Sequence, residues 1–402
     1  MRLPRAAWQR RPGLRALLDA LGAREGDTRY VGGCVRDTLL GIEVNDVDLA
    51  TRLAPAEVMA RLGRARIKAV PTGLAHGTVT AIVEGKPVEV TTLRRDVSTD
   101  GRRATIAYTD DWREDAARRD FTINALSADP KSLAVFDYFG GWEDVRQRLV
   151  RFIGDPLTRI AEDHLRILRF FRFHARFGGG EPDTAALDAC TARANDLMAL
   201  SRERIADELL KLLALPDPFV TVGLMVARGI LRPVLPEIGA DGVAALAALP
   251  PRERAAAVAP DPLRRLAALL PPDPDVAAAV AARLRLSNKA AKRLVGAAAR
   301  SPADPADPAL LAFRAGREAA VDRILLGAGD PAGAAALAGW HKPRLGVRGG
   351  DLIGLGLTPG PIVARTLQRI EEEWAASGFP ADAKAQRDIA RRQVDQALRE
   401  SQ

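Results

Sequence analysis

All the strand-like segments of this sequence lie before residue 150, and this division constrains the fold more than any other feature. The segments are short, rich in β-branched residues and separated by Gly, Pro or polar turns, a pattern typical of strands. They are TRYVGG (28–33), VDLA (47–50), ARIKAV (65–70), HGTVTAIV (76–83) and KPVEVTTL (86–93). Helical stretches interrupt them after Cys34 and after Pro55. This part of the chain is therefore predicted to form a mixed α/β domain.

From about residue 151 onward the sequence predicts helices only. Leucine and alanine recur at helical spacing, and clusters rich in proline punctuate them. We expect these clusters to be helix stops and starts rather than a linker, because each is followed by another periodic segment. They are LPDP (215–218), LPPRE (249–253), LLPPDPD (269–275) and SPADPADPA (301–309).

The basic N-terminus resembles a transit peptide in composition, but its leucines favour a helix that belongs to the folded protein. It lacks the apolar segment of a signal peptide, and its leucines occupy one helical face that leads directly into the first strand. These leucines are Leu14, Leu17, Leu18 and Leu21.

Length and composition narrow the class of protein. A chain of 402 residues is too long for one core and predicts two to four domains. Lys and Arg number 59 against 51 Asp and Glu, and this mild surplus permits a nucleic-acid partner without requiring one. No apolar run reaches the roughly 18–20 residues of a membrane helix. Cys34 and Cys190 form no CxxC motif, which favours a reducing compartment, so we expect a cytoplasmic protein.

Two aspartates separated by one residue carry the clearest chemical signal. In a strand, Asp46 and Asp48 would point to one side and Val47 to the other. Adjacent carboxylates repel each other unless a cation lies between them, and oxygen ligands at this spacing suit Mg²⁺. A solvated turn is the competing interpretation, because an Asp-x-Asp sequence is frequent by chance.

Glu89 supplies a third carboxylate. Val88 and Val90 occupy the opposite face of its predicted strand, so Glu89 interrupts an apolar stretch. It would lie where a neighbouring strand can meet Asp46 and Asp48. An edge-strand glutamate facing water is the alternative.

Gly32 and Gly33 follow a predicted strand and precede a predicted helix. Amides at such a position can hold phosphates, and Arg36 adds positive charge nearby. A glycine pair before a helix is also common as a simple tight turn.

An ordered set of motifs resembles the class II CCA-adding enzymes and their bacterial poly(A) polymerase relatives, within the polymerase-β nucleotidyltransferase superfamily. The match spans about residues 29–177 and resumes near the C-terminus. The motifs are GGCVRD (32–37), DVDLA (46–50), HGTVTAIV (76–83), VEVTTLRRD (88–96), ARRDFTINAL (117–126), EDHLRILRFFRF (162–173) and GGDLIGLGLTPGP (349–361).

The resemblance implies an α+β fold, with a polymerase-β-like nucleotidyltransferase head of mixed sheet and helices followed by an all-helical neck, body and tail. The expected divisions are an N-terminal helix packed on the head (1–27), the catalytic head (28–150), a neck for base recognition (151–215), the body (216–345) and a tail contacting tRNA (346–402).

The resemblance also assigns roles to residues. Asp46 and Asp48 would bind Mg²⁺, with Glu89 as a third catalytic carboxylate. Within the nucleotide site, the glycines and Arg36 would lie by the triphosphate, the paired arginines near the nucleotide, and Asp120 at the ribose hydroxyls. Asn124 would orient its neighbours from the interior. The residues implied for this site in the head are Gly32, Gly33, Arg36, Arg118, Arg119, Asp120 and Asn124.

The EDHLR segment is predicted to choose the base. On a helix, Asp163 and Arg166 would project from one face, one turn apart. An ordinary salt bridge between them is the interpretation that spacing alone favours. The resemblance implies that this pair accepts C and A, because a carboxylate accepts from their exocyclic amines and repels the carbonyls of U and G. His164 departs from the family, which often has Pro there.

The arginines of this helix continue beyond Arg166 as Arg169, Arg172 and Arg176. They would form a solvated face or contact triphosphate or tRNA, and only Arg166 and Arg169 are assigned to the nucleotide. The apolar residues between them are predicted to be packed core. These are Ile167, Leu168, Phe170, Phe171 and Phe173.

The interval 93–112 is polar and basic and contains Gly101. In CCA-adding enzymes this interval holds a flexible loop needed for the switch from C to A. The length and content of the interval favour addition of both nucleotides.

The sequence therefore predicts an enzyme that adds CCA to the 3′ end of tRNA from CTP and ATP by direct attack on the α-phosphorus. No membrane or obligate protein partner is implied. A poly(A) polymerase, a partial CC- or A-adding enzyme, and an inactive RNA-binding scaffold are the alternatives. The charge-mixed C-terminal segment 382–402 argues against the first, and the retained carboxylates argue against the last. None of the four histidines is followed by Asp, which argues against an HD-type phosphohydrolase domain.

Overall fold

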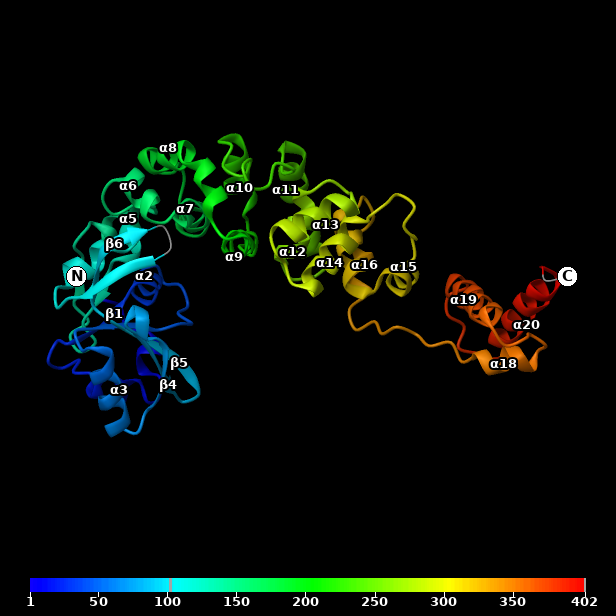
Figure 1. The fold of residues 1–402 in the computed structure, drawn as a ribbon, viewed down its shortest axis with the longest axis horizontal. Helices are drawn as coiled ribbons and strands as arrows, with labels where there is room; N and C mark the ends of the chain where they lie inside the picture. Colours follow the sequence, from blue (N-terminus) through cyan, green and yellow to red (C-terminus); the bar gives the residue numbers. More distant parts are fainter. Residues whose placement is uncertain (101–102, 401–402) are drawn as a thin grey trace. The chain divides into compact units, whose positions relative to one another are not determined.

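The computed structural model describes residues 1–100 and 103–400 (Figure 1). Internal contacts divide the chain into two compact units, Met1–Pro236 and Glu237–Gln402, and each is treated by itself below. Among the described residues, every named strand lies in the first unit and the named elements of the second are all helices. The predicted α+β fold, with a mixed head followed by helices, is confirmed.

A seven-stranded sheet forms the framework of the first unit, in the order β3-β4-β5-β2-β1-β8-β9. Its β2–β5 pair is parallel and its other neighbours are antiparallel, so the sheet is mixed as predicted. The five predicted strand segments became β1 to β5. The strands of this sheet are β1 (Thr28–Val31), β2 (Asp48–Thr51), β3 (Lys68–Gly73), β4 (Thr78–Val83), β5 (Lys86–Thr92), β8 (Ser127–Ala128) and β9 (Val135–Phe136).

The interval expected to hold a flexible loop contains two paired strands among its described residues, and its flexibility stays a prediction. Strands β6 (Arg94–Asp100) and β7 (Arg103–Tyr108) pair antiparallel, with Arg94 opposite Tyr108 and Asp100 opposite Arg103. The β-branched residues Val97, Thr99, Thr105 and Ile106 favour extended backbone, and the polar residues around them concealed this signal. Gly101, which contributed to the loop prediction, lies outside the described residues.

The N-terminal segment packs on the head through buried leucines and one tryptophan. Leu14, Leu17 and Leu21 are at most 1% exposed. Trp8 packs edge-on against Tyr30 of β1, with ring centroids 4.8 Å apart. Its indole Nε1 donates to Thr38 Oγ1 at 2.9 Å. The elements of this segment are η1 (Ala7–Arg10) and α1 (Leu14–Ala20).

The remaining helices of the first unit surround the sheet or continue beyond it along the chain. They are α2 (Gly33–Leu39), α3 (Pro55–Arg64), η2 (Leu74–His76), α4 (Trp112–Ala117), η3 (Thr122–Asn124), α5 (Gly141–Gln147), α6 (Pro156–Glu162), α7 (Leu165–Phe177), α8 (Thr184–Ala192), η4 (Ala194–Ala199), α9 (Arg202–Leu213) and α10 (Phe219–Ala227).

An aromatic cluster joins α7 to the motif that follows Asp120. The ring of Phe121 lies 5.2 Å from that of Phe173 and 5.0 Å from that of Phe152, measured between centroids. Phe152 in turn stacks near Phe170. The apolar residues predicted to be core in this helix are all buried, so that prediction is confirmed.

The second unit contains only helices among its described residues, coloured yellow-green to red in Figure 1. They are α11 (Ala240–Ala255), α12 (Pro262–Leu269), α13 (Pro274–Arg283), α14 (Asn288–Ala298), α15 (Pro308–Ala315), α16 (Arg317–Leu326), α17 (Ala332–Ala335), α18 (Gly349–Gly354), α19 (Pro361–Ala376) and α20 (Ala383–Glu400). None of the described helices is long and apolar enough to cross a membrane.

The proline clusters behave as helix boundaries with one exception. Pro274 and Pro308 each begin a helix, as predicted, and Pro262, outside the predicted clusters, does the same. The N-cap of each of these three helices is an aspartate. The LPPRE cluster was predicted to end a helix, and this is wrong because Pro250 and Pro251 lie inside α11. Burial of the α11 face against α12 and α16 outweighs the two lost amide donors.

Candidate active site

Asp48 and Glu89 lie opposite each other on neighbouring parallel strands. Asp48 is the first residue of β2, and Glu89 is its Cα partner in β5. Residues in register on adjacent strands project to the same face of a sheet. The prediction that the Glu89 strand runs beside Asp48 is confirmed.

The prediction that Asp46 shares a strand with Asp48 is wrong. Strand β2 begins at Asp48, and residues 42–47 before it are irregular. The pairing of β2 with β1 covers Leu49–Thr51, and β1 ends at Val31 just before α2, so β1 provides no partner as far back as Asp46. The alternation of exposure nevertheless persists, since Val47 is 2% exposed while Asp46 is exposed and Asp48 is half-buried.

Like charges surround Asp48. The pKa of Asp48 is raised to about 6, first by burial and then by the charges of Glu89 and Asp46, while Arg119 acts in the opposite direction. Carboxylates that disfavour each other's ionisation in this way become ionised together once a cation neutralises them. The arrangement therefore suits a divalent cation.

The donor set fits magnesium bound together with a substrate. No group of three His, Cys, Asp or Glu side chains among the described residues converges closely enough to enclose an ion. Mg²⁺ is commonly held by one or two carboxylates, with waters and substrate phosphates completing its shell. Asp46 and Asp48 are the carboxylates that would hold it here, with Glu89 adjacent.

Gly32 lies where a larger residue would not fit. Its φ is 68° and its ψ is −125°, a conformation that other residues rarely adopt. A Cβ atom on Gly32 would lie 3.1 Å from Nη1 of Arg119. Gly33 begins α2 directly afterwards, so the glycine pair, the start of α2 and one arginine meet beside the sheet.

Asp115 holds both arginines of the ARRD motif. Arg118 Nε lies 2.9 Å from Asp115 Oδ1, and Arg119 Nη2 lies 3.3 Å from Asp115 Oδ2. Burial lowers the pKa of Arg118 to about 10, although Asp115 raises it. Burial alone would raise the pKa of Asp115, but the two arginines hold it below its usual value. Asp115 thereby fixes the positions of both guanidinium groups.

Arg159 of α6 supports the same segment. Its Nη2 donates to the carbonyl oxygens of Arg118 at 2.7 Å and Arg119 at 2.6 Å. Its Nη1 contacts Glu162 at 2.5 Å. Arg159 is 8% exposed. It therefore connects α6 to the ARRD motif.

Asp120 and Asn124 form a buried polar pair. Asn124 Nδ2 donates to Asp120 Oδ1 at 3.0 Å, and the carbonyl oxygen of Asn124 accepts from Arg119. Arg169 of α7 donates twice to Asp120 Oδ2, from Nε at 2.8 Å and Nη2 at 2.6 Å. Asp120 thus joins the head to α7, and its contact with a ribose stays a prediction.

Arg36 lies deeper than its predicted place beside a triphosphate suggests. It is 5% exposed, and burial lowers its pKa. Its guanidinium donates to Asn124 Oδ1 and Asp37 and lies 3.9 Å from the ring centre of Phe177. These contacts give Arg36 a structural role between α2 and α7, and a triphosphate contact stays untested.

Asp163 and Arg166 do not share a helix, which corrects the predicted geometry. Helix α6 ends at Glu162 and α7 begins at Leu165, so Asp163 lies between them with φ −153° and ψ 106°. Its carboxylate caps the start of α7 by accepting from Leu165 N–H at 3.1 Å. That local hydrogen bond competes with a continuous helix.

Each member of the pair has a different partner, so the ordinary salt bridge between them is also wrong. Asp163 Oδ2 accepts from Arg204 Nη2 of α9 at 2.8 Å. Arg166 Nη1 lies 2.6 Å from Glu162 and donates to the Arg159 carbonyl oxygen at 2.8 Å. The separate partners leave the two side chains held independently, and their predicted contact with a base is untested.

The other arginines of α7 are ion-paired rather than a freely solvated face. Arg172 Nε lies 2.5 Å from Glu208 of α9, and Arg176 lies 3.5 Å from Asp37. The partners that hold the predicted site residues in place were not predicted from the sequence. Only Glu162 carried a signal, since it adjoins Asp163 in the EDHLR motif. The partners missed are Asp115, Arg159, Glu162, Arg204 and Glu208.

Two family models match this chain. The one described as the poly A polymerase head domain matches residues 28–151. The one described as a probable RNA and SrmB-binding site of polymerase A matches residues 181–241. The first covers the sheet, the glycine pair and the ARRD motif.

Relatives of known name match much of the chain. The CCA tRNA nucleotidyltransferase 1, mitochondrial, of Mus musculus is 34% identical over 91% of this chain and 87% of its own length. The CCA-adding enzyme of Geobacillus thermodenitrificans is 38% identical over 53% of this chain and 52% of its own.

A solved structure agrees. The crystal structure of the Bacillus stearothermophilus CCA-adding enzyme in complex with CTP matches with a TM-score of 0.76 and 28% identity, over 97% of this chain and 99% of the other. The sequence relationship extends along almost the whole length of the mouse protein. This chain therefore belongs to the CCA-adding tRNA nucleotidyltransferase family.

Proposed function

We propose that this chain adds C and A residues to the 3′ end of tRNA without a template, using CTP and ATP and releasing pyrophosphate. The observation that carries the proposal is the register of Asp48 and Glu89, with Gly32 and Arg119 beside them. The named relatives are CCA-adding enzymes, and one of them was solved with CTP. No observation favours a poly(A) polymerase, a partial enzyme or an inactive scaffold.

The metal is proposed to be Mg²⁺, held by Asp46 and Asp48. When bound, it would activate the tRNA 3′ hydroxyl and neutralise charge on the departing pyrophosphate. Glu89 adds negative charge that strengthens cation binding beside Asp48. Arg119, fixed by Asp115, offers positive charge for the triphosphate next to the Gly32 amide. No covalent enzyme intermediate is needed.

Base choice is proposed to rest on Asp163 and Arg166. Arg204 holds one carboxylate oxygen of Asp163, and Glu162 holds the guanidinium of Arg166. Side chains fixed in this way present a constant pattern of acceptor and donors, which C and A match and U and G do not. Fixed geometry replaces a template strand.

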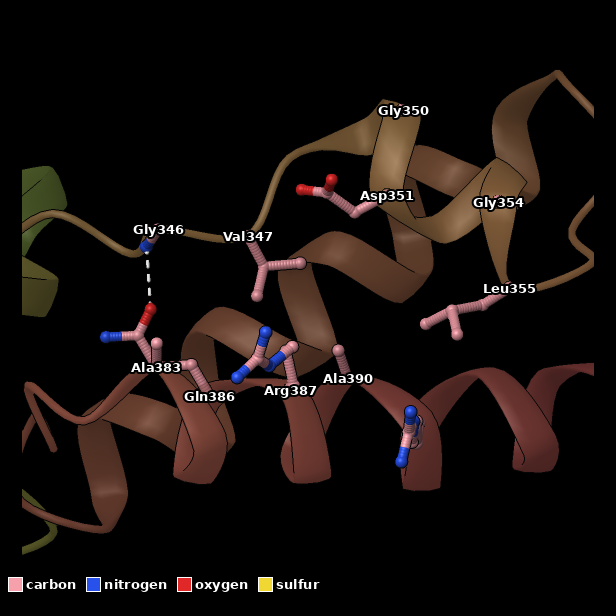
Figure 2. Close-up of a pocket in the computed structure, with 11 residues that line it drawn as sticks. Gly346, Val347, Gly350, Asp351, Gly354, Leu355, Ala383, Gln386, Arg387 and Ala390 are labelled. Carbon is pink, nitrogen blue, oxygen red and sulfur yellow. Dashed lines mark hydrogen bonds between the residues drawn. The ribbon is translucent and has the colours of Figure 1, made fainter.

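The tail is proposed to contact tRNA, as expected for residues 346–402. A hollow of about 540 Å³ there is lined by Gly346, Gly350, Arg387 and Arg391, among others. Figure 2 shows the Arg387 side chain between α20 and the segment that carries Val347. Arginines beside exposed glycine backbone suit phosphate contacts, which position RNA without selecting sequence. The division into head, neck, body and tail is likewise a proposal. A cytoplasmic location is also a proposal, because the mouse relative is named mitochondrial.

The test supplies purified protein and Mg²⁺ with tRNAs that lack CCA, end in C or end in CC, and offers each labelled NTP separately. Incorporation of C, C and then one A, with no further addition, is the expected result. A long A ladder would indicate a poly(A) polymerase, and addition of C alone or A alone would indicate a partial enzyme. Absence of transfer would favour the RNA-binding scaffold.

A further inference from the structure

Arg11 donates hydrogen bonds to the backbone directly before the proposed metal ligand Asp46. Its Nη2 donates to the carbonyl oxygens of Val44 at 2.8 Å and Asn45 at 3.0 Å. Its Nη1 donates to the Asn45 carbonyl at 3.0 Å. Three hydrogen bonds from one guanidinium thus meet the two peptide groups that lead into Asp46.

Arg11 is itself held on a rigid support. Its backbone N–H donates to the Trp8 carbonyl at 3.2 Å, and its own carbonyl accepts from Leu14 N–H at 3.2 Å. Trp8 is anchored on α2 through Thr38 and on β1 through Tyr30. Arg11 can fix the Asp46 segment only if Arg11 itself is held in place, and these contacts hold it.

The gripped segment needs outside support. Residues 42–47 have no strand or helix, although the segment carries a residue whose position matters for metal binding. Val44 and Val47 of this segment are buried, but Asn45 and Asp46 between them are exposed. Packing therefore fixes Val44 and Val47, and Arg11 fixes the peptide groups between them through the Val44 and Asn45 carbonyls.

We infer that Arg11 is a positioning residue that orders the Asp46 segment for metal binding, an inference that rests on the proposed function. It comes from the N-terminal segment, outside the matched head region of residues 28–151. Groups that orient a metal ligand commonly change metal affinity by about 10- to 100-fold when removed. The guanidinium fork matters because an ammonium cannot reach both carbonyls with the same geometry.

The experiment compares R11A, R11K and R15A in the full chain. Arg15 lies on the same segment, its side chain is 87% exposed, and its loss changes net charge equally without touching the Asp46 segment. Three measurements are made: hydrogen exchange of residues 42–47 without metal, Mn²⁺ binding in the presence of CTP by electron paramagnetic resonance, and the Mg²⁺ concentration for half-maximal transfer. Thermal unfolding checks that each variant is folded.

R11A is expected to exchange faster at 42–47 and to need about tenfold more metal in both metal measurements. R11K is expected to fall between R11A and the wild type, and it replaces R11A if that variant does not fold. R15A is expected to match the wild type throughout. Equal metal dependence of R11A and R15A would overturn the inference, whether or not exchange differs. If wild-type protein transfers no nucleotide, the proposed function fails, and exchange together with Mn²⁺ binding still decides on Arg11.

Discussion

Arg169 donates both of its short hydrogen bonds to one oxygen of Asp120, although 49 residues separate them in the chain. The pair links α7, in the predicted neck, to the end of the ARRD motif in the head. Asn124 occupies the other oxygen of Asp120. The separation between the proposed base-choosing residues and the proposed metal site therefore depends partly on one buried carboxylate.

Asp120→Asn should destabilise the first unit by about 3 kcal/mol at neutral pH, because Arg169 loses the nearer of its two acidic partners and keeps only Glu208, 3.6 Å away. Burial alone would raise the pKa of Asp120, but Arg169 and the hydrogen bonds from Asn124 and the Phe121 N–H hold it below its usual value. A depressed folded-state pKa contributes stability that is present above the unfolded pKa of about 4 and lost as pH falls through the folded value.

Denaturant unfolding of wild type and Asp120→Asn at a series of pH values measures this contribution. The difference in unfolding free energy should be constant above pH ~5 and shrink below pH ~4. Asp188→Asn is the matched control, because Asp188 is 61% exposed and its contact with Arg228 spans 3.4 Å. A difference for Asp120→Asn that grows with acidification would show that Asp120 is not ionised in the folded protein.

Gly32→Ala should reduce nucleotide transfer by about tenfold or more, because the added methyl is strained by the positive φ and pushes Arg119 away from the site. Single-turnover transfer of CTP to a tRNA that lacks CCA measures the effect. Gly26→Ala separates the two causes: Gly26 has φ +86° with nothing within 4 Å of its Cβ position. If both variants lose activity equally, the approach of Arg119 is irrelevant.

Asp48→Ala should abolish transfer, by about 10³-fold or more, while tRNA binding stays nearly intact, because the proposed metal loses a ligand and the tRNA contact is proposed for residues 346–402. Glu43→Ala provides the control, since Glu43 is an exposed carboxylate in the irregular segment that leads to Asp46. Transfer assays and filter binding of labelled tRNA give the two quantities. Wild-type turnover by Asp48→Ala would remove the metal assignment.

The sequence predicted the elements whose signals are local. Strands β1 to β5 were located by β-branched residues between turns, and the helices that begin at Pro274 and Pro308 by their proline clusters. The proximity of the Glu89 strand to Asp48 was anticipated because Glu89 interrupts an apolar strand. Where several local preferences agree, the pattern is sufficient to locate an element.

The sequence failed where an outcome depended on contacts between distant residues. The break at Asp163 is fixed by its cap on Leu165 and by Arg204, which lies 41 residues away. The buried position of Arg36 depends on Asn124, 88 residues away. Spacing within one motif carries no information about such partners, so a continuous helix was the natural but incorrect expectation, and the burial of Arg36 was not anticipated.

Asp163→Ala should loosen base choice, because the acceptor for the exocyclic amine of C or A is lost together with its repulsion of U and G. Discrimination against UTP and GTP should fall by about tenfold or more, the range associated with losing a well-placed polar contact to a base. The measurement is kcat/KM for each of the four nucleotides on tRNA lacking CCA.

Arg204→Ala keeps the carboxylate but removes the 2.8 Å contact that holds it, so its effect should be in the same direction and smaller. Lys211→Ala on the same helix, which loses only an exposed contact with Asp207, should leave selectivity unchanged. Undiminished rejection of UTP and GTP by Asp163→Ala would exclude this carboxylate from base choice, and an Arg204→Ala effect larger than that of Asp163→Ala would mean that Arg204 meets the base itself.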